Sequence, residues 1–337
     1  MAARVLCTLS LPEPFVKLVS GQANLRSLDR IPGREALCAE LRANPVDVLC
    51  PQLRDAVDGD VLDSGLPRLR AVCVYAVGFD NVDVDAATAR GVVVANTPGV
   101  LTDATADLAF ALILATARRI VEGDRELRAG RYEGWEPTYL LGLDLHGAQL
   151  GVLGFGRIGQ AVARRALAFS MRVVYHDSTD PPVAAELRDA ARSVSLEELL
   201  RESDVVTLHT PLSEATHHLI GERALHAMKS TAVLVNTSRG PVIDEEALVR
   251  ALREGWIAGA GLDVYEREPE LAPGLSECPN AVLAPHLGSA TVRTRAAMAE
   301  STALNTLDAL AGRVPRHCVN PDAWRGTVAA PLIDVPA

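Results

Sequence analysis

Residues 149–177 read QLGVLGFGRIGQAVARRALAFSMRVVYHD and contain Gly154, Gly156 and Gly159 in the spacing G-x-G-x-x-G. The triplet follows an apolar run typical of a strand and opens a helical pattern. In this context the first glycine permits a tight turn, the second lets the backbone approach a pyrophosphate, and the third lets the helix pack closely on the strand. Asp177 ends the next predicted strand, where an acid can bind a ribose diol. The segment predicts a dinucleotide-binding βαβ unit, although the glycines alone also suit a plain strand-to-helix turn.

The alternation of short apolar runs and helical patterns extends from this unit in both directions. Besides 149–153 and 172–175, we expect strands at 5–9, 47–50, 70–75, 92–96, 205–209, 232–236, 258–263 and 281–284. One long, mostly buried helix is expected over 104–127, and a last helix over 290–310. The prediction is an α/β fold of two doubly wound parallel-sheet domains. A Rossmann nucleotide domain, 100–287, is inserted into a discontinuous, flavodoxin-like substrate domain made of 1–99 and 288–337.

Composition limits the classes of function. A chain of 337 residues suits two domains. The net charge of -10 argues against binding to nucleic acid or to an anionic membrane surface, since a basic stripe is needed there. The six cysteines have no metal spacing and lie in apolar runs, which is typical of reduced thiols. The amino-terminal segment makes a poor signal peptide, and no apolar run is long enough to cross a membrane. We therefore expect a cytoplasmic protein.

Three ionisable residues fall at the predicted ends of strands in one sheet. Arg239 follows the strand 232–236, Glu268 follows 258–263, and His286 follows 281–284. An arginine at this edge could hold a carboxylate through two parallel hydrogen bonds, although a salt-bridged loop arginine is an equal alternative. A histidine joined to a glutamate is a candidate general acid, whereas a lone histidine is more often structural. The other histidines, including His217 and His218, have no ligand spacing, so no metal is expected.

Taken together, the motifs resemble those of the D-2-hydroxyacid dehydrogenase family, most closely its glyoxylate/hydroxypyruvate reductase branch. The matching segments are VGFDN at 77–81, NTPGVLT at 96–102, the glycine triplet, SRG at 238–240, GLDV at 261–264, EP at 268–269 and PHLGSAT at 285–291. They run through nearly the whole chain in the family's order.

The resemblance implies roles for individual residues. Arg239, Glu268 and His286 would be the catalytic trio, and the backbone N–H groups of Val77 and Gly78 would bind the substrate carboxylate. Further contacts to NAD(H) would come from Thr105, Arg157, Ile158, Asp177, Thr210, Thr216, Ser238 and Asp263. Structural roles are equally good alternatives for two of these residues: Thr105 could cap a helix, and Thr216 could be a turn residue.

The implied reaction is hydride transfer between NAD(H) and a small 2-oxo acid, giving a D-2-hydroxy acid. Asp177 favours NADH over NADPH, because a 2'-phosphate there would meet like charge. In similar enzymes the region around Trp135 crosses a homodimer interface, although Trp135 could equally be buried in its own subunit. The alternatives are an NAD-sensing protein like co-repressors of this fold, or a phosphite or phosphoglycerate dehydrogenase. Phosphite enzymes carry a lysine where this chain has Val77, and no room remains for a carboxyl-terminal regulatory domain.

Overall fold

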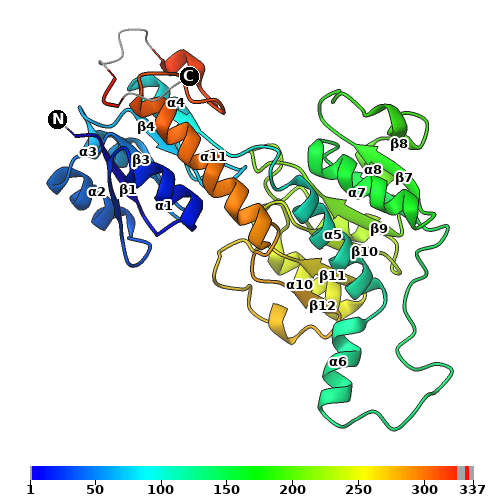
Figure 1. The fold of residues 1–337 in the computed structure, drawn as a ribbon. Coiled ribbons are helices and arrows are strands. Elements are labelled where there is room, and N and C mark those ends of the chain that lie inside the picture. Colours follow the sequence, from blue (N-terminus) through cyan, green and yellow to red (C-terminus); the bar gives the residue numbers. More distant parts are fainter. Residues whose placement is uncertain (1, 325–330, 334–337) are drawn as a thin grey trace. The chain divides into compact units, whose positions relative to one another are not determined.

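A computed structural model describes residues 2–324 and 331–333 of the chain (Figure 1). The chain divides into two compact units. Unit 1 comprises Met1–Leu101 and Thr291–Ala337, and unit 2 comprises Thr102–Ala290. The predicted carboxyl-terminal part of the outer domain includes 325–330 and 334–337, which lie outside the described residues. Within the described part of the chain, every helix is too short or too polar to cross a bilayer.

Unit 1 is built on a five-stranded parallel sheet in the order β2-β1-β3-β4-β5, which is the flavodoxin-like order. The strands are Arg4–Cys7 (β1), Asn24–Ser27 (β2), Val48–Cys50 (β3), Ala71–Cys73 (β4) and Val93–Ala95 (β5). The helices are Glu13–Ser20 (α1), Arg34–Ala43 (α2), Gly59–Gly65 (α3), Val84–Ala89 (α4) and Val292–Leu310 (α11). All residues of β3, β4 and β5 are buried, as expected when helices cover both faces of a parallel sheet. Helix α11 packs against α1 and contacts β3 and β4.

The outer edge of β5 is covered by the segment that follows α11. Ala95 forms an antiparallel bridge with Cys318. The N–H of Val94 donates to Oδ1 of Asn320 at 2.7 Å, and the amide of Asn320 donates to the carbonyl of Val92 at 3.1 Å. The backbone polar groups at this edge are therefore paired within the chain.

Unit 2 contains a seven-stranded parallel sheet in the order β12-β11-β10-β9-β6-β7-β8. The strands are Gln149–Leu153 (β6), Arg172–His176 (β7), Ala191–Ser193 (β8), Val205–Leu208 (β9), Val233–Asn236 (β10), Gly259–Leu262 (β11) and Ala281–Leu283 (β12). Counted from β6, this is the Rossmann order 3-2-1-4-5-6 with one strand added. The order reverses between β6 and β9, and open sheets of this type bind ligands at the carboxyl ends of the strands near such a point. The predicted α/β class and doubly wound sheets are confirmed.

Apolar cores lie on both faces of this sheet. The helices are Thr102–Ala117 (α5), Ile120–Arg128 (α6), Arg157–Ala168 (α7), Leu196–Glu202 (α8), Glu222–Ala227 (α9) and Glu245–Glu254 (α10). Helices α5 and α7 contribute to one core, and α8, α9 and α10 to the other. Neighbouring strand residues such as Val205 and Val206 enter different cores, because side chains alternate between the faces of a strand. Ser195 caps α8 by accepting a hydrogen bond from the N–H of Glu198 at 3.1 Å.

The prediction of one long, buried helix over 104–127 is wrong. Helix α5 ends at Ala117, and Arg119 has a left-handed conformation with φ 52° before α6 begins. The chain returns across this break, where the N–H of Leu143 donates to the carbonyl of Ala117 at 2.8 Å. The carbonyl group of Ala117 therefore accepts its hydrogen bond from Leu143 and not from a following turn of the same helix. Helix α6 has no buried residue, so the second half of the predicted helix is not buried as expected.

Candidate active site

The three glycines of the fingerprint have different surroundings. Gly154 has φ +89°, and a Cβ there would lie 2.7 Å from the carbonyl carbon of His209. A Cβ on Gly159 would lie 2.2 Å from the carbonyl oxygen of Gly154, so the start of α7 packs directly on the turn. Gly156 is exposed, and a Cβ there would meet nothing within 4 Å. The open side of the turn therefore lies at Gly156, where α7 begins and its free N–H groups favour an anion.

Asp177 follows β7 and faces this turn. Its Oδ2 accepts a hydrogen bond from the N–H of Phe155 at 2.7 Å, and its Oδ1 accepts from the N–H and hydroxyl of Thr179 at 2.9 and 2.7 Å. Partial burial alone would raise the pKa of Asp177, but the hydrogen bonds from Thr179 and Phe155, with His176 nearby, together lower it. The carboxylate is thus ionised at neutral pH and fixed beside the glycine turn.

Two buried polar atoms at the end of β9 have no hydrogen-bond partner among the described residues. They are Nδ1 of His209 and Oγ1 of Thr210. Both residues adjoin the turn, because a Cβ on Gly154 would lie 2.8 Å from the backbone nitrogen of Thr210. An unpaired buried polar group is costly, so a ligand that supplies its partner is favoured. The turn, the carboxylate and these orphaned atoms fit a dinucleotide.

Three other predicted cofactor residues, Thr105, Thr216 and Ser238, already have protein partners. The hydroxyl of Thr105 donates to the carbonyl of Gly288 at 3.1 Å, which ties α5 to the loop after β12. The hydroxyl of Thr216 donates to the carbonyl of Pro211 at 2.7 Å and shapes an exposed turn. Ser238 donates to Oδ1 of Asn236 at 2.8 Å. Arg157 and Ile158 form the first turn of α7, where Arg157 is exposed.

The predicted trio comes from the carboxyl ends of three adjacent strands. Arg239 follows β10, Glu268 follows β11, and His286 follows β12. Nδ1 of His286 is 2.9 Å from Oε2 and 3.2 Å from Oε1 of Glu268. Burial alone would raise the pKa of Glu268, but the hydrogen bond and charge of His286, the N–H of Tyr265 and the charge of Arg239 lower it. The histidine and the glutamate are therefore joined as the sequence predicts, and Nε2 of the ring makes no hydrogen bond within residues 2–324 and 331–333.

Asp263 anchors the loop that carries His286. Its carboxylate accepts hydrogen bonds from the N–H groups of Leu287 at 2.6 Å and Gly288 at 2.8 Å, and its carbonyl accepts from the N–H of His286 at 2.9 Å. The residue is 1% exposed, and this burial raises the pKa of its carboxyl group. His286 itself has φ 54°, a conformation that side-chain-bearing residues rarely adopt. The loop therefore fixes the direction of the imidazole.

Gly240, next to Arg239, lies where a side chain has no room. A Cβ on Gly240 would lie 1.9 Å from the carbonyl carbon of Tyr265 and 2.3 Å from the nitrogen of Glu266. The segment after Arg239 thus packs backbone to backbone on the segment before Glu268. The only signal in the sequence is the glycine itself, next to a proline.

Val77 and Gly78 belong to unit 1 and follow β4 in the chain. Both residues are half-buried, and their N–H groups donate no hydrogen bond within the described residues. The carbonyl of Val77 accepts from the amide of Asn96 at 2.7 Å, which holds the loop in place. Two adjacent unpaired N–H groups suit an anionic ligand.

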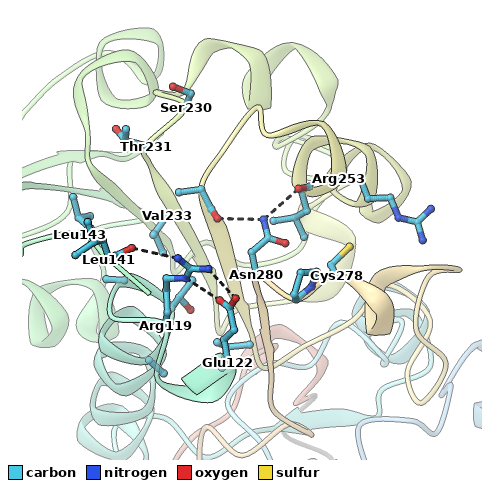
Figure 2. Close-up of a pocket in the computed structure, with 18 of the residues that line it drawn as sticks. Arg119, Glu122, Leu141, Leu143, Ser230, Thr231, Val233, Arg253, Cys278 and Asn280 are labelled. Carbon is cyan, nitrogen blue, oxygen red and sulfur yellow. Dashed lines mark hydrogen bonds and ion pairs between the residues drawn. The ribbon is translucent and has the colours of Figure 1, made fainter. Parts of the chain in front are cut away.

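A pocket of about 740 Å³ in unit 2 lies away from these residues (Figure 2). It is formed at the amino ends of β10, β11 and β12, where Arg119 pairs with Glu122 at 2.7 Å. Asn280 also lines it and donates to the carbonyls of Leu252 and Ala258, each at 3.2 Å. Because the trio and the glycine turn lie at the opposite, carboxyl edge of the sheet, this pocket is not the candidate active site.

Known proteins share the fold and much of the sequence of this chain. The family model "D-isomer specific 2-hydroxyacid dehydrogenase, NAD binding domain" matches residues 110–288. A glyoxylate reductase of Thermococcus litoralis is 48% identical over 328 residues, which cover 96% of this chain and 98% of that protein. The crystal structure of a glyoxylate reductase from Paecilomyes thermophila has a TM-score of 0.84 and 35% identity, and the match covers 94% of this chain and 98% of that one. The crystal structure of an NADPH-dependent glyoxylate/hydroxypyruvate reductase from Sinorhizobium meliloti, in complex with NADP and malonate, has a TM-score of 0.85 and 32% identity. That match covers 96% of this chain and 99% of the other. These matches confirm the resemblance seen in the motifs, and the chain belongs to the D-isomer specific 2-hydroxyacid dehydrogenases, a family of NAD(P)-dependent oxidoreductases.

Proposed function

We propose that the protein reduces glyoxylate and hydroxypyruvate with NADH. The observation that carries the proposal is the pairing of His286 with an ionised Glu268 beside Arg239, at the ligand-binding edge of the sheet. The curated relatives named glyoxylate reductase support the choice of a short 2-oxo acid.

In this mechanism Arg239 binds the substrate carboxylate and polarises the 2-oxo group. The bound cofactor supplies the hydride that reduces the carbonyl carbon. His286, oriented through its Nδ1 by Glu268, gives a proton from Nε2 to the carbonyl oxygen, which becomes the 2-hydroxyl group. In the reverse direction the same nitrogen accepts the proton. The N–H groups of Val77 and Gly78 are proposed to bind the carboxylate as well.

The cofactor is proposed to lie along the carboxyl edge of unit 2, with its pyrophosphate at Gly156 and the start of α7. The residues proposed to contact it are Thr105, Gly154, Gly156, Arg157, Ile158, Gly159, Asp177, Thr210, Thr216, Ser238 and Asp263. The preference for NADH rests on Asp177, whose ionised carboxylate can accept hydrogen bonds from ribose hydroxyls and repels a 2'-phosphate. The three residues that follow it, Ser178, Thr179 and Asp180, carry no positive charge.

The domain and assembly predictions remain proposals. We propose that 100–287 is the NAD-binding domain and that 1–99 with 288–337 is the substrate domain, in a cytoplasmic homodimer. Exposed apolar side chains on and after α6 support the dimer, because Leu127 is 62% exposed, Trp135 82% and Leu141 66%. We propose that Trp135 is covered by the partner subunit.

The test is steady-state kinetics of NADH and NADPH oxidation with glyoxylate, hydroxypyruvate, pyruvate and 2-oxoisocaproate. We expect the highest kcat/KM for glyoxylate or hydroxypyruvate with NADH. A preference for 2-oxoisocaproate would refute the substrate assignment, and equal or better use of NADPH would refute the role of Asp177. Tight NADH binding without turnover of any 2-oxo acid would instead favour the NAD-sensing alternative.

A further inference from the structure

Two adjacent histidines and a glutamate from another loop meet on unit 2. His217 and His218 lie in the loop after β9, and Glu266 lies in the loop after β11. One ligand atom from each residue lies within 4.8 Å of the others. The two imidazole rings are stacked with 4.1 Å between centroids, and Nε2 of His218 is 3.0 Å from Oε1 of Glu266.

The backbone around this cluster is held by hydrogen bonds. The N–H of His218 donates to the carbonyl of Pro241 at 2.8 Å. The N–H of Glu266 donates to Oε1 of Glu245 at 2.6 Å, and the N–H of Glu245 lies 3.4 Å from Oε2 of Glu266. The loops that carry the three side chains are therefore already in place, so a ligand would have to order only the side chains themselves.

Negative charge accumulates behind the cluster. Glu245 is only 3% exposed and lies next to Glu266. The carboxyl groups of Glu245 and Glu266 repel each other when both are ionised. A cation bound to Glu266 would reduce this repulsion between carboxylates.

We propose that His217, His218 and Glu266 form a binding site for one transition-metal dication, such as Zn²⁺. Two imidazoles and a carboxylate are a ligand set that Zn²⁺ accepts, with water completing the tetrahedron. Because bond lengths are roughly 2.0–2.2 Å, ligand atoms that lie as far as 4.8 Å apart must approach one another by on the order of an ångström. Both histidines are exposed, so their side chains have room to move. The ion replaces the direct hydrogen bond between His218 and Glu266.

A bound ion would connect two loops that serve the active site. His217 and His218 follow Thr216, and Glu266 lies two residues before Glu268. The histidine pair has no ligand spacing in the sequence, and Glu266 follows His218 only after 48 residues. We expected no metal from the sequence for this reason, since the third ligand comes from a different strand end.

The experiment is calorimetric titration of the untagged, full-length protein with Zn²⁺ in the micromolar range. We expect one ion per chain, and binding weakened by about tenfold or more in His217→Gln. This variant is informative because the side chain of His217 makes no hydrogen bond in the described part of the chain. Its ring only stacks on that of His218. Glu266→Gln should weaken binding similarly. The matched control is His146→Gln, which removes an exposed histidine outside the cluster and should bind Zn²⁺ like the wild type.

Retained NADH binding by each variant shows that it is folded. No binding to the wild type would overturn the proposal. So would equal affinity in the wild type and His217→Gln, because the ion would then lie elsewhere, for example at His286 and Glu268. An equal loss in His146→Gln would also overturn it, because it would indicate nonspecific binding to surface histidines.

Discussion

Replacing Gly240 by alanine should disable the trio without removing any of its side chains. The new Cβ would lie 1.9 Å from the carbonyl carbon of Tyr265, whereas real Cβ atoms essentially never approach another heavy atom within 3.0 Å. The two backbone segments must therefore separate by about 1.1 Å, the difference between these distances. Because the atoms of Tyr265 and Glu266 that the new Cβ would overlap belong to the backbone, a side-chain rotation cannot relieve the overlap. Either Arg239 or Glu268 then moves.

A misplacement of ~1 Å in an active site can cost about 100-fold in rate, and we expect a loss of this size in kcat/KM. The overlap should also lower the free energy of unfolding by about 1–3 kcal/mol. Steady-state kinetics, NADH titration and urea unfolding separate the two effects, and NADH affinity should change little. Gly33→Ala is the control, since a Cβ there meets nothing within 4 Å and the residue lies in unit 1. A Gly240→Ala enzyme with wild-type kcat/KM would show that the two segments are not rigidly coupled.

Four further predictions address individual side chains. His286→Ala should lower kcat by about 100-fold or more while NADH affinity is retained; near-normal turnover would remove His286 from the mechanism. Arg239→Lys should strongly reduce kcat/KM for 2-oxo acids, because a point charge cannot replace the bidentate guanidinium; an unchanged value would place the carboxylate elsewhere. Asp177→Ala combined with Ser178→Arg should narrow or reverse an NADH preference of about tenfold or more, measured as the ratio of kcat/KM values; an unaltered ratio would contradict the assignment. Burial lowers the pKa of His209 to about 3 from 6.5, so the unfolded chain takes up a proton that the folded protein does not. The contribution of His209 to the free energy of unfolding is therefore fully present above about pH 6.5 and is lost as the pH decreases, by at most ~2 kcal/mol between about pH 7 and about pH 5. Urea unfolding should show this loss in the wild type and not in His209→Asn, and equal losses in both proteins would refute the prediction.

The sequence predicts the central strands and the edge strands β5 and β12, but it misses the edge strands β2 and β8. Strands β6, β9 and β10 are runs of apolar residues buried on both faces, which is the pattern that identifies parallel strands. The strands β2 and β8 read NLRS and ARS, and both lie at the edge of a sheet, where polar side chains face solvent. Their pairing depends on the neighbouring strand rather than on a pattern of their own. The break after α5 was missed for a similar reason, because the segment that crosses it lies some 25 residues later in the chain.

The site was predictable to the extent that it follows from parallel topology. Once Arg239, Glu268 and His286 are placed at the ends of strands, a parallel sheet brings them to one edge, and the contact between Glu268 and His286 follows. The close packing of Gly240 on Tyr265 cannot be predicted from the topology, since it depends on how closely the backbones of two loops approach each other. Nor does the approach of His218 to Glu266, which requires the loop conformation after β9.

The interrupted path of the chain through unit 1 has a consequence for the order in which the protein forms. Unit 2 is one continuous stretch, Thr102–Ala290, so all of its strands have been synthesised before α11 is made. The first 101 residues leave the ribosome earlier, yet α1, β3 and β4 pack against α11, and the edge of β5 is closed by Cys318 and Asn320. Synthesis proceeds from the amino terminus, and domains generally fold as units. The part of the protein that is made first is therefore the part that is completed last, and until then it presents an unpaired strand edge to other chains.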